Sequence, residues 1–288
     1  DLSPEERPRV GKLLNEAKGQ IAHALQEKVG TLKTSRPVAA PLDVTLPGPE
    51  PARGAIHPLT RTIEEISDIF AGLGFSVAEG PEVETEHYNF EALNMPIDHP
   101  SRDAFDTLFL GNGVLMRSHT STVQIRYMKR NDPPVRIIAP GRVYRNETPD
   151  ASHGSEFYQL EGLYVDRGVR FGELKGVLIK FMRELLGENV NTRFRAGYFP
   201  FTEPSTEVDV ECWMCGGSGC SVCKGTGWVE LLGAGMVDPR VFEAVGYDPD
   251  EFTGYAFGIG VDRICMTLTG VGDIRLFLEN DLRFLRQL

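Results

Sequence analysis

The N-terminal part of the chain carries apolar residues at helical spacing. One apolar stripe runs through Val10, Leu14, Ala17, Ile21, Ala24 or Leu25, and Val29. Ser3, Pro4 and Glu6 have the order of an N-cap, a first-turn proline and a capping-box glutamate. Pro8 can delay the start of this helix or kink its first turns. We expect a helical arm over residues 1–34, whose stripe packs either on the chain's own globular body or on another chain or an RNA.

The pattern changes after this arm. Residues 35–56 contain five prolines, at positions 37, 41, 47, 49 and 51. Proline has no backbone donor and a fixed φ, so this density excludes a helix and a central strand. We expect residues 35–56 to be a linker and residues 57–288 to form the main domain.

Helical and strand patterns alternate in the main domain. "HPLTRTIEEISDIFAGLG" has apolar residues at helical spacing and stops at a glycine, and "FSVAEGPEVE" then predicts a strand. "FDTLFLGNGVLMR" predicts a hairpin that turns at Gly111 to Gly113, and "VRIIAPGRVYR" and "FYQLEGLYV" predict two strands joined by a polar loop. Helices are expected at about 171–186 and 260–269. Short connections between successive strands favour an antiparallel sheet flanked by helices, which is an α+β fold.

Composition narrows the class of protein. The chain has 288 residues, of which 41% are hydrophobic, and acidic residues outnumber basic ones 41 to 30. No apolar run approaches the length of a membrane-spanning helix, so we expect a soluble, cytoplasmic protein. The acidic balance argues against nonspecific coating of nucleic acid. The chain starts at Asp1 without a methionine, so we also expect it to be N-terminally truncated.

Four of the five cysteines lie in "CWMCGGSGCSVCKGTG", which contains two tandem copies of C-x-x-C-x-G-x-G. Thiolates paired two residues apart suit tetrahedral zinc, so Cys212, Cys215, Cys220 and Cys223 are candidate zinc ligands. A site with four protein ligands has no open position for a substrate and is structural. A disulfide pair and a reduced, metal-free loop are the alternatives. The flanking runs "TEVDVE" and "WVELLGAGM" are strand-like, so we expect a small zinc hairpin inserted at residues 211–228.

Two other segments carry candidate chemistry. "GRVYRNETPDASHGSEFYQLEG" places Arg145 and Glu147 at the end of one strand and His153 and Phe157 near the start of the next. Arginine suits phosphate or carboxylate, and an aromatic face suits a base. "GYAFGIGVDRICM" runs a small-residue strand into a helix that carries Arg263. Taken singly, each of these residues can have an ordinary structural role, such as a surface arginine or a phenylalanine of the core.

Together these segments resemble motifs 2 and 3 of the class II aminoacyl-tRNA synthetases, and the segment from His57 to Glu84 resembles motif 1. "SHTSTVQIRYM", "APGRVYR", "FPFTEP" and "LENDLRFLRQL" resemble the family of bacterial phenylalanyl-tRNA synthetase alpha subunits in order and spacing. The resemblance covers about Val44 to Leu288. Asp262 departs from it, because the family usually has glutamate before the motif 3 arginine, and the cysteine hairpin is an insertion that many members lack.

The resemblance implies ATP-dependent activation of L-phenylalanine and its transfer to the cognate tRNA, by the catalytic alpha subunit of an α2β2 enzyme. It implies catalytic roles for Arg145, Arg263, Glu147 and His153, with Arg145, Phe157 and Arg263 binding ATP. It also implies that the amino acid is bound by His119, Ser121, Gln124, Gln159, Glu161, Phe199, Phe201, Ala256 and Gly258. Without the resemblance, an alternative is that His119 and Ser121 simply cap the following helix.

The resemblance further implies that Glu203 binds Mg²⁺ together with the beta subunit. Two alternatives remain open at this point. One is a class II-like ligase paralogue that activates another carboxylate, which predicts loss of Arg145 or Arg263 or a changed pocket wall. The other is a non-catalytic, zinc-containing RNA-binding module, which predicts basic and aromatic residues around the cysteines.

Overall fold

The computed structural model describes residues 3–34, 45, 48, 54–96, 98–99, 102, 107–151, 153–220 and 222–288. Backbone contacts divide the chain into two units, Asp1–Gly54 and Ala55–Leu288, and each is described by itself. Most of the predicted linker at 35–56 lies outside the described residues. The division of the chain into arm, linker and main domain therefore stays a prediction.

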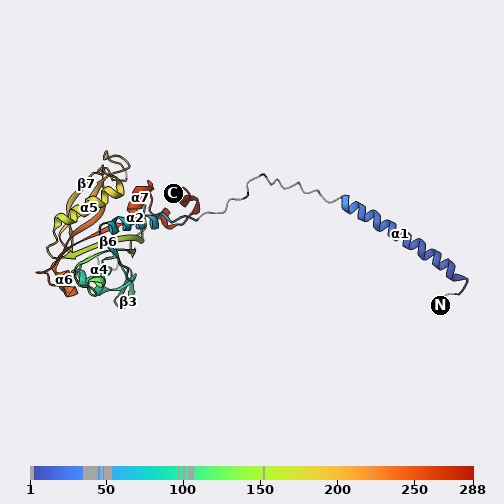
Figure 1. The fold of residues 1–288 in the computed structure, drawn as a ribbon, viewed down its shortest axis with the longest axis horizontal. Helices are drawn as coiled ribbons and strands as arrows, with labels where there is room; N and C mark the ends of the chain where they lie inside the picture. The colour runs from blue at the N-terminus through green and yellow to red at the C-terminus, as the bar shows by residue number, and fades with distance from the viewer. Residues whose placement is uncertain are drawn as a thin grey trace. The chain divides into compact units, whose positions relative to one another are not determined.

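Within its described residues, the first unit contains the helix α1 (Glu6–Thr34), which confirms the helix predicted from the apolar stripe (Figure 1). The Ser3 hydroxyl and backbone N–H both donate to the Glu6 carboxylate, at 2.8 and 3.2 Å. Pro8 lies inside the first turns without ending the helix, because the N–H groups there have no intrahelical acceptor. Leu14, Ile21 and Leu25 are each more than half exposed.

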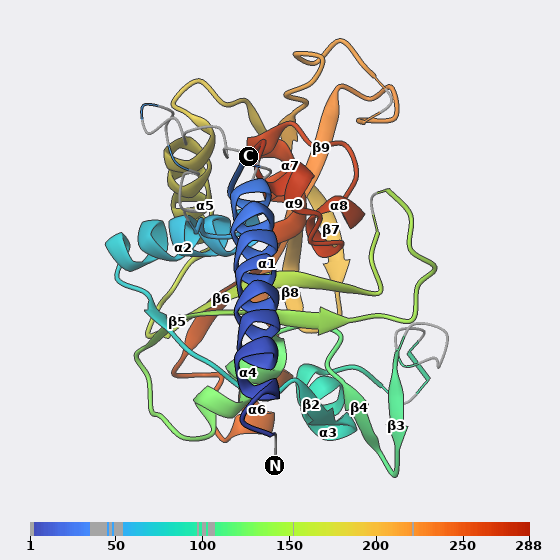
Figure 2. The ribbon, with the colours of Figure 1, turned by 90° about the vertical axis from the view of Figure 1, so that its right-hand side faces the viewer.

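The second unit is built on a seven-stranded sheet in the order β1-β5-β6-β10-β9-β8-β7. Its strands are β1 (Ser76–Val77), β5 (Val135–Tyr144), β6 (Glu156–Asp166), β7 (Thr192–Phe199), β8 (Thr202–Glu211), β9 (Trp228–Val237) and β10 (Thr253–Gly260). The expected antiparallel pairing is confirmed for every neighbouring pair except β1 with β5, which are parallel. Figure 2 shows β5, β6, β8 and β9 with the connection between β8 and β9 extending beyond the strand ends.

A small second sheet contains the predicted hairpin. It has the order β2-β4-β3, with β2 (Val83–Thr85), β3 (Phe109–Gly111) and β4 (Val114–Met116). The turn uses positive φ at Gly111, Asn112 and Gly113, which explains the sequence Gly-Asn-Gly there. "FSVAEGPEVE" is not one strand as expected. It contributes β1 to the large sheet and β2 to the small one, because Gly80 and Pro81 separate the two pieces.

Helices cover both faces of the large sheet. They are α2 (Pro58–Gly72), α3 (Glu86–Asn89), η1 (Glu91–Leu93), α4 (Ser121–Met128), α5 (Phe171–Leu186), α6 (Pro239–Val245), α7 (Val261–Thr269), α8 (Arg275–Leu278) and α9 (Leu282–Leu285). Residues of α2, α5 and α7 form one core with the sheet, and residues of η1, α4 and α6 form a second core. No described helix is long and apolar enough to span a bilayer.

Strand β10 shows how the two cores are separated. Tyr255, Phe257 and Ile259 belong to the core under α2 and α5, whereas Ala256 between them belongs to the other core. This follows from the alternation of side chains along a strand. Because β10 pairs with both β6 and β9, its residue Gly258 lies beside Glu161 and Gly233. The small residues of β10 and β9 therefore face the cavity described below.

Phe70 is the centre of the larger core. Its ring is fully buried and stacks at 4.8 Å on both Phe181 and Phe257. Phe70→Ala should lower the free energy of unfolding by about 3–5 kcal/mol, because it removes a buried ring and leaves a cavity. Asp68→Ala, at an exposed position of the same helix, should change it by less than about 0.5 kcal/mol. Urea unfolding followed by circular dichroism measures both, and equal effects would contradict this description of the core.

Candidate active site

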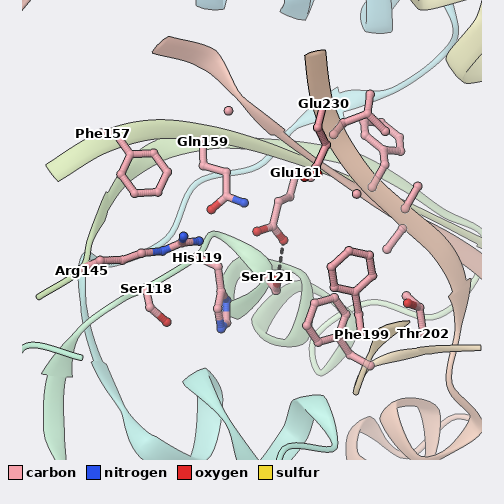
Figure 3. Close-up of a pocket in the computed structure, with 18 of the residues that line it drawn as sticks. Ser118, His119, Ser121, Arg145, Phe157, Gln159, Glu161, Phe199, Thr202 and Glu230 are labelled. Carbon is pink, nitrogen blue, oxygen red and sulfur yellow. Dashed lines mark hydrogen bonds between the residues drawn. The ribbon is translucent and has the colours of Figure 1, made fainter. Parts of the chain in front are cut away.

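A cavity of about 730 Å³ opens between the large sheet and the segments around α4 and the β7–β8 turn. Arg145 and Phe157 lie on one side of it and Phe199 and Thr202 on the other (Figure 3). The polar side chains of His119, Ser121, Gln159 and Glu161 lie between these two ends. The cavity thus has a cationic, aromatic end, a polar middle and an apolar end.

Glu161 is the buried carboxylate of the polar middle. It projects from β6 and is 5% exposed. It accepts hydrogen bonds from Thr120 N at 3.1 Å, from Gln124 Nε2 at 3.3 Å and from the Ser121 hydroxyl. Burial raises the pKa of Glu161 to about 7, although these donors act in the opposite direction.

The loop before α4 and the first residue of that helix supply the other polar groups. Ser121 donates to Glu161, and α4 has no side-chain cap, so neither His119 nor Ser121 serves as the cap that the local pattern allowed. The His119 ring bonds the backbone oxygen of Asn89 at 3.0 Å. Burial and then the positive charge of Arg145 lower its pKa to about 4, so the ring is neutral near pH 7.

Two polar atoms in the polar middle of this cavity lack partners among the described residues. They are His119 Nδ1 and Gln159 Oε1, both buried in the structure. A buried polar atom without a hydrogen bond costs roughly 1–3 kcal/mol, so an unpartnered pair in a cavity indicates a ligand. His119 Nε2 donates to the Asn89 oxygen, so Nδ1 of the neutral ring is an acceptor. Together with Gln159 Oε1 and the Glu161 carboxylate, it can accept hydrogen bonds from the ammonium of an amino acid.

The cationic end brings together side chains from two distant segments. The Arg145 guanidinium lies 5.0 Å from the Phe157 ring centroid and 3.8 Å from Glu147. Arg263, at the start of α7, donates to the backbone oxygen of Glu230 at 3.2 Å. All of these residues line the cavity. Two guanidinium groups and an aromatic face suit a nucleotide, because a guanidinium can bind a phosphate or stack on a base, and the ring can stack on the base.

The apolar end is walled by aromatic rings. The rings of Phe199 and Phe201 stack with centroids 5.8 Å apart, and Ala256 lies on the same cavity wall. Gly233 makes room for Phe199, because a Cβ at that position would lie 2.6 Å from the ring Cζ. An aromatic side chain of a ligand fits between such walls.

Most residues singled out from the sequence line this single cavity. They are His119, Ser121, Gln124, Arg145, Glu147, His153, Phe157, Gln159, Glu161, Phe199, Phe201, Ala256, Gly258 and Arg263. His153 lies at its rim, where its ring faces the Asp150 carboxylate at 3.1 Å. Glu203 is not part of the lining and is exposed on β8. The roles of all these residues stay predictions.

Sequence reasoning missed several residues of the site. Glu230, Thr202 and Asp262 line the cavity but were given no role. Arg117 is 3% exposed and donates to the backbone oxygens of Arg142, Gly80 and Pro81. The sequence did mark Glu230 as a candidate site residue, because it is a charged residue within the apolar strand pattern "WVELLGAGM". No local pattern distinguishes Arg117 from a surface arginine.

The cysteine segment joins β8 to β9, as expected. The four sulfur atoms of Cys212, Cys215, Cys220 and Cys223 lie within 4.8 Å of one another, and none is in a disulfide. Three of the separations are 3.8 Å, and a tetrahedron with Zn–S bonds of about 2.3 Å has edges of about 3.8 Å. Cys265 is buried among apolar residues and is not part of the cluster.

Backbone amides favour the thiolate form of Cys223, whereas burial raises the pKa of Cys212 to about 12. Gly219 N donates to Cys215 Sγ at 3.1 Å, and Cys220 N and Gly227 N donate to Cys223 Sγ at 3.1 and 3.2 Å. Burial raises the pKa of Cys223, but these amides outweigh burial and lower it to about 6. The donor set therefore fits a soft divalent metal ion.

Comparisons with known proteins agree with this geometry. The family model for the tRNA synthetases class II core domain (F) matches residues 41–288, and the model for the aminoacyl tRNA synthetase class II, N-terminal domain matches residues 1–38. A pyrrolysyl-tRNA synthetase structure from Desulfitobacterium hafniense has a TM-score of 0.59 at 16% identity, over 98% of this chain and 87% of that chain. This likeness shows the fold alone.

Curated relatives match at much higher identity. The phenylalanine–tRNA ligase alpha subunit of Geobacter sulfurreducens is 54% identical over 290 residues, which cover 99% of this chain and 85% of the relative. The alpha subunits of Moorella thermoacetica and Geobacillus kaustophilus are each 55% identical over 292 residues. They cover 99% of this chain and 86% and 85% of the respective relatives.

The raised pKa of Glu161 predicts pH-dependent binding of L-phenylalanine, the substrate that the resemblance implies. With a pKa of about 7, the carboxyl is mostly protonated at pH 6 and mostly ionised at pH 8. Binding of the substrate ammonium should therefore tighten about tenfold from pH 6 to pH 8. His119 stays neutral across this window because its pKa is about 4.

Isothermal titration calorimetry at pH 6, 7 and 8 measures this dependence. Glu161→Gln is the matched control, because it keeps the shape but cannot ionise, and it should bind weakly with no change over this range. A wild-type dissociation constant that stays flat, or tightens as the pH falls, would show that Glu161 does not bind the ammonium.

Proposed function

Because the chain belongs to the family of phenylalanine–tRNA ligase alpha subunits, within the class II tRNA synthetases, we propose that it is the catalytic alpha subunit of an α2β2 enzyme. It activates L-phenylalanine with ATP and transfers it to the cognate tRNA. One observation carries this proposal: a single cavity joins a nucleotide-like end at Arg145, Phe157 and Arg263 to an aromatic pocket at Phe199 and Phe201.

In the first step, a carboxylate oxygen of phenylalanine attacks the α-phosphorus of ATP. The new O–P bond gives phenylalanyl-adenylate, and the bond to the β-phosphate oxygen breaks to release pyrophosphate. Arg145 holds the carboxylate and the α-phosphate, and Phe157 and Arg263 stack on the two faces of the adenine. Catalysis here is positioning and stabilisation of charge at the phosphorus.

In the second step, a ribose hydroxyl at the 3′ end of the tRNA attacks the carbonyl carbon of the adenylate. The ester forms, the bond from the carbonyl carbon to the phosphate oxygen breaks, and AMP leaves. Glu161, Gln124 and Ser121 hold the amino group through both steps. Glu147 and His153 lie at the cavity rim and help to orient the substrates.

The beta subunit and Mg²⁺ complete the proposed enzyme. ATP enters with Mg²⁺, which neutralises phosphate charge when it is bound. Glu203 is exposed and does not line the cavity, so it does not contact the substrate within this chain, and it would hold Mg²⁺ together with the beta subunit. A carboxylate oxygen is the donor that Mg²⁺ prefers. As an enzyme of translation, the assembly works in the cytoplasm.

The cysteine hairpin binds one structural Zn²⁺ through Cys212, Cys215, Cys220 and Cys223. The sulfur separations of 3.8 Å and the amides that donate to Cys215 and Cys223 support zinc over a disulfide. All four ligands come from the protein, so this ion takes no part in the reaction.

Pyrophosphate exchange with each amino acid tests the proposed activity, with and without the beta subunit. We expect exchange with phenylalanine only in the presence of the beta subunit. Arg145→Ala and Arg263→Ala should each lose about 2–4 kcal/mol of transition-state stabilisation, a loss of roughly 30- to 1,000-fold. Arg283→Ala, whose side chain is 91% exposed, is the control and should retain the wild-type rate.

Other results would contradict the proposal. Exchange with a different carboxylate would indicate a ligase paralogue, and no exchange by the assembled complex would indicate a non-catalytic module. Wild-type rates in either arginine variant would overturn the site assignment.

The zinc proposal predicts one Zn²⁺ per chain in protein purified without added metal, measured by elemental analysis. Chelation should lower the thermal midpoint of unfolding, because the metal stabilises the folded hairpin. Cys220→Ser should lose the metal, whereas Cys265→Ser should retain it. Four titratable thiols without zinc would contradict the site.

A further inference from the structure

Asp262 is a buried carboxylate that has no role in the proposed binding of ATP or of phenylalanine. It is 1% exposed and lies in the first turn of α7, immediately before Arg263. Its Oδ2 accepts a hydrogen bond from Tyr158 N at 2.6 Å. Its Oδ1 has no partner among the described residues. Ionised carboxylates are rarely buried unless they are paired, so this one requires an explanation.

The sheet explains why Tyr158 needs an acceptor. Pairing between β6 and β10 ends where Gln159 lies beside Gly260. After Gly260 the chain turns into α7, so β6 continues past its neighbour with a backbone N–H that has lost its strand partner. A buried N–H must find an acceptor, and Asp262 supplies it from the helix.

The next residue makes the opposite connection. Strand β10 lies between β6 and β9, and α7 follows β10 directly. From the first turn of α7, Asp262 reaches back to β6, whereas Arg263 reaches the backbone oxygen of Glu230 on β9 at 3.2 Å. Adjacent side chains therefore tie the start of this helix to both neighbours of the strand from which it emerges.

These ties lie at the nucleotide end of the cavity. Tyr158 is flanked by Phe157 and Gln159, which both line the cavity together with Arg263. The hydrogen bond from Tyr158 N to Asp262 thus fixes the peptide that follows Phe157 relative to the helix that carries Arg263. The spacing between Phe157 and Arg263 determines whether an adenine fits between them.

We propose that Asp262 is a positioning residue that sets the width of the adenine slot by holding the first turn of α7 against β6 at Tyr158. The proposal rests on the proposed function, because the slot is defined by ATP. Asp262 acts through Tyr158 and Arg263 and not by direct contact with the reacting atoms. Its loss should weaken ATP binding and leave the phenylalanine pocket intact.

Asp262→Ala and Asp262→Asn, assembled with the beta subunit, test this in pyrophosphate exchange. The alanine variant should raise the KM for ATP about tenfold or more and leave the KM for phenylalanine within about twofold. The asparagine variant keeps an acceptor oxygen for Tyr158 N–H, so its KM for ATP should stay within about threefold of wild type. Thr269→Val, at the other end of α7, is the matched control and should change neither value.

A second variant and a second readout guard against a folding defect. Asp262→Glu restores the residue that the family usually has here and keeps a carboxylate acceptor for Tyr158 N–H, so its KM for ATP should stay within about threefold of wild type. The dissociation constant of a fluorescent ATP analogue should follow the KM for ATP in every variant.

The proposal is overturned if the alanine variant leaves the KM for ATP unchanged, or raises both KM values equally. It is also overturned if the asparagine variant is as impaired as the alanine variant. Failure of the proposed function is a separate result, because it appears in the wild-type enzyme as exchange that does not depend on phenylalanine.

Discussion

The pairing of β10 between β6 and β9 is the constraint on which the site depends. It brings Gly258 beside Glu161 on one side and Gly233 on the other, although these residues are far apart in the sequence. Glycine at both positions leaves room above the sheet, and larger side chains there would meet the Glu161 carboxylate or the Phe199 ring. The cavity exists because small residues meet at the centre of the sheet while large residues point to the opposite core.

This constraint also explains why acidic groups can be buried near the substrates. Glu161 and Asp262 are both almost inaccessible, and burial raises the pKa of both, to about 7 and about 6. Each accepts hydrogen bonds from backbone or side-chain donors, and neither forms a salt bridge within the part of the chain that the structure describes. Charges held in this way act on a ligand in a low local dielectric, where their interactions are stronger than in water.

Much of the fold follows from local patterns in the sequence. The helices at 6–34, 58–72 and 171–186, the hairpin at Gly111–Gly113 and the strands on either side of the cysteines all have a clear period or turn signal. The position of β10 has no such signal, since it pairs with strands that precede it by many residues. The same applies to Arg117, whose buried guanidinium is satisfied by backbone oxygens from two distant segments.

The site residues were predictable to the extent that a family resemblance named them. Chemistry alone indicated arginines for phosphate and cysteines for zinc, but it did not join the cationic segments to the aromatic segment at Phe199 and Phe201.

The central claim is that one cavity holds both halves of phenylalanyl-adenylate. A crystal structure of the α2β2 enzyme with a non-hydrolysable phenylalanyl-adenylate analogue tests it most directly. We predict one molecule with its adenine between Phe157 and Arg263 and its phenyl ring against Phe199 and Phe201. An analogue bound elsewhere, or with its two ends exchanged, would contradict the account.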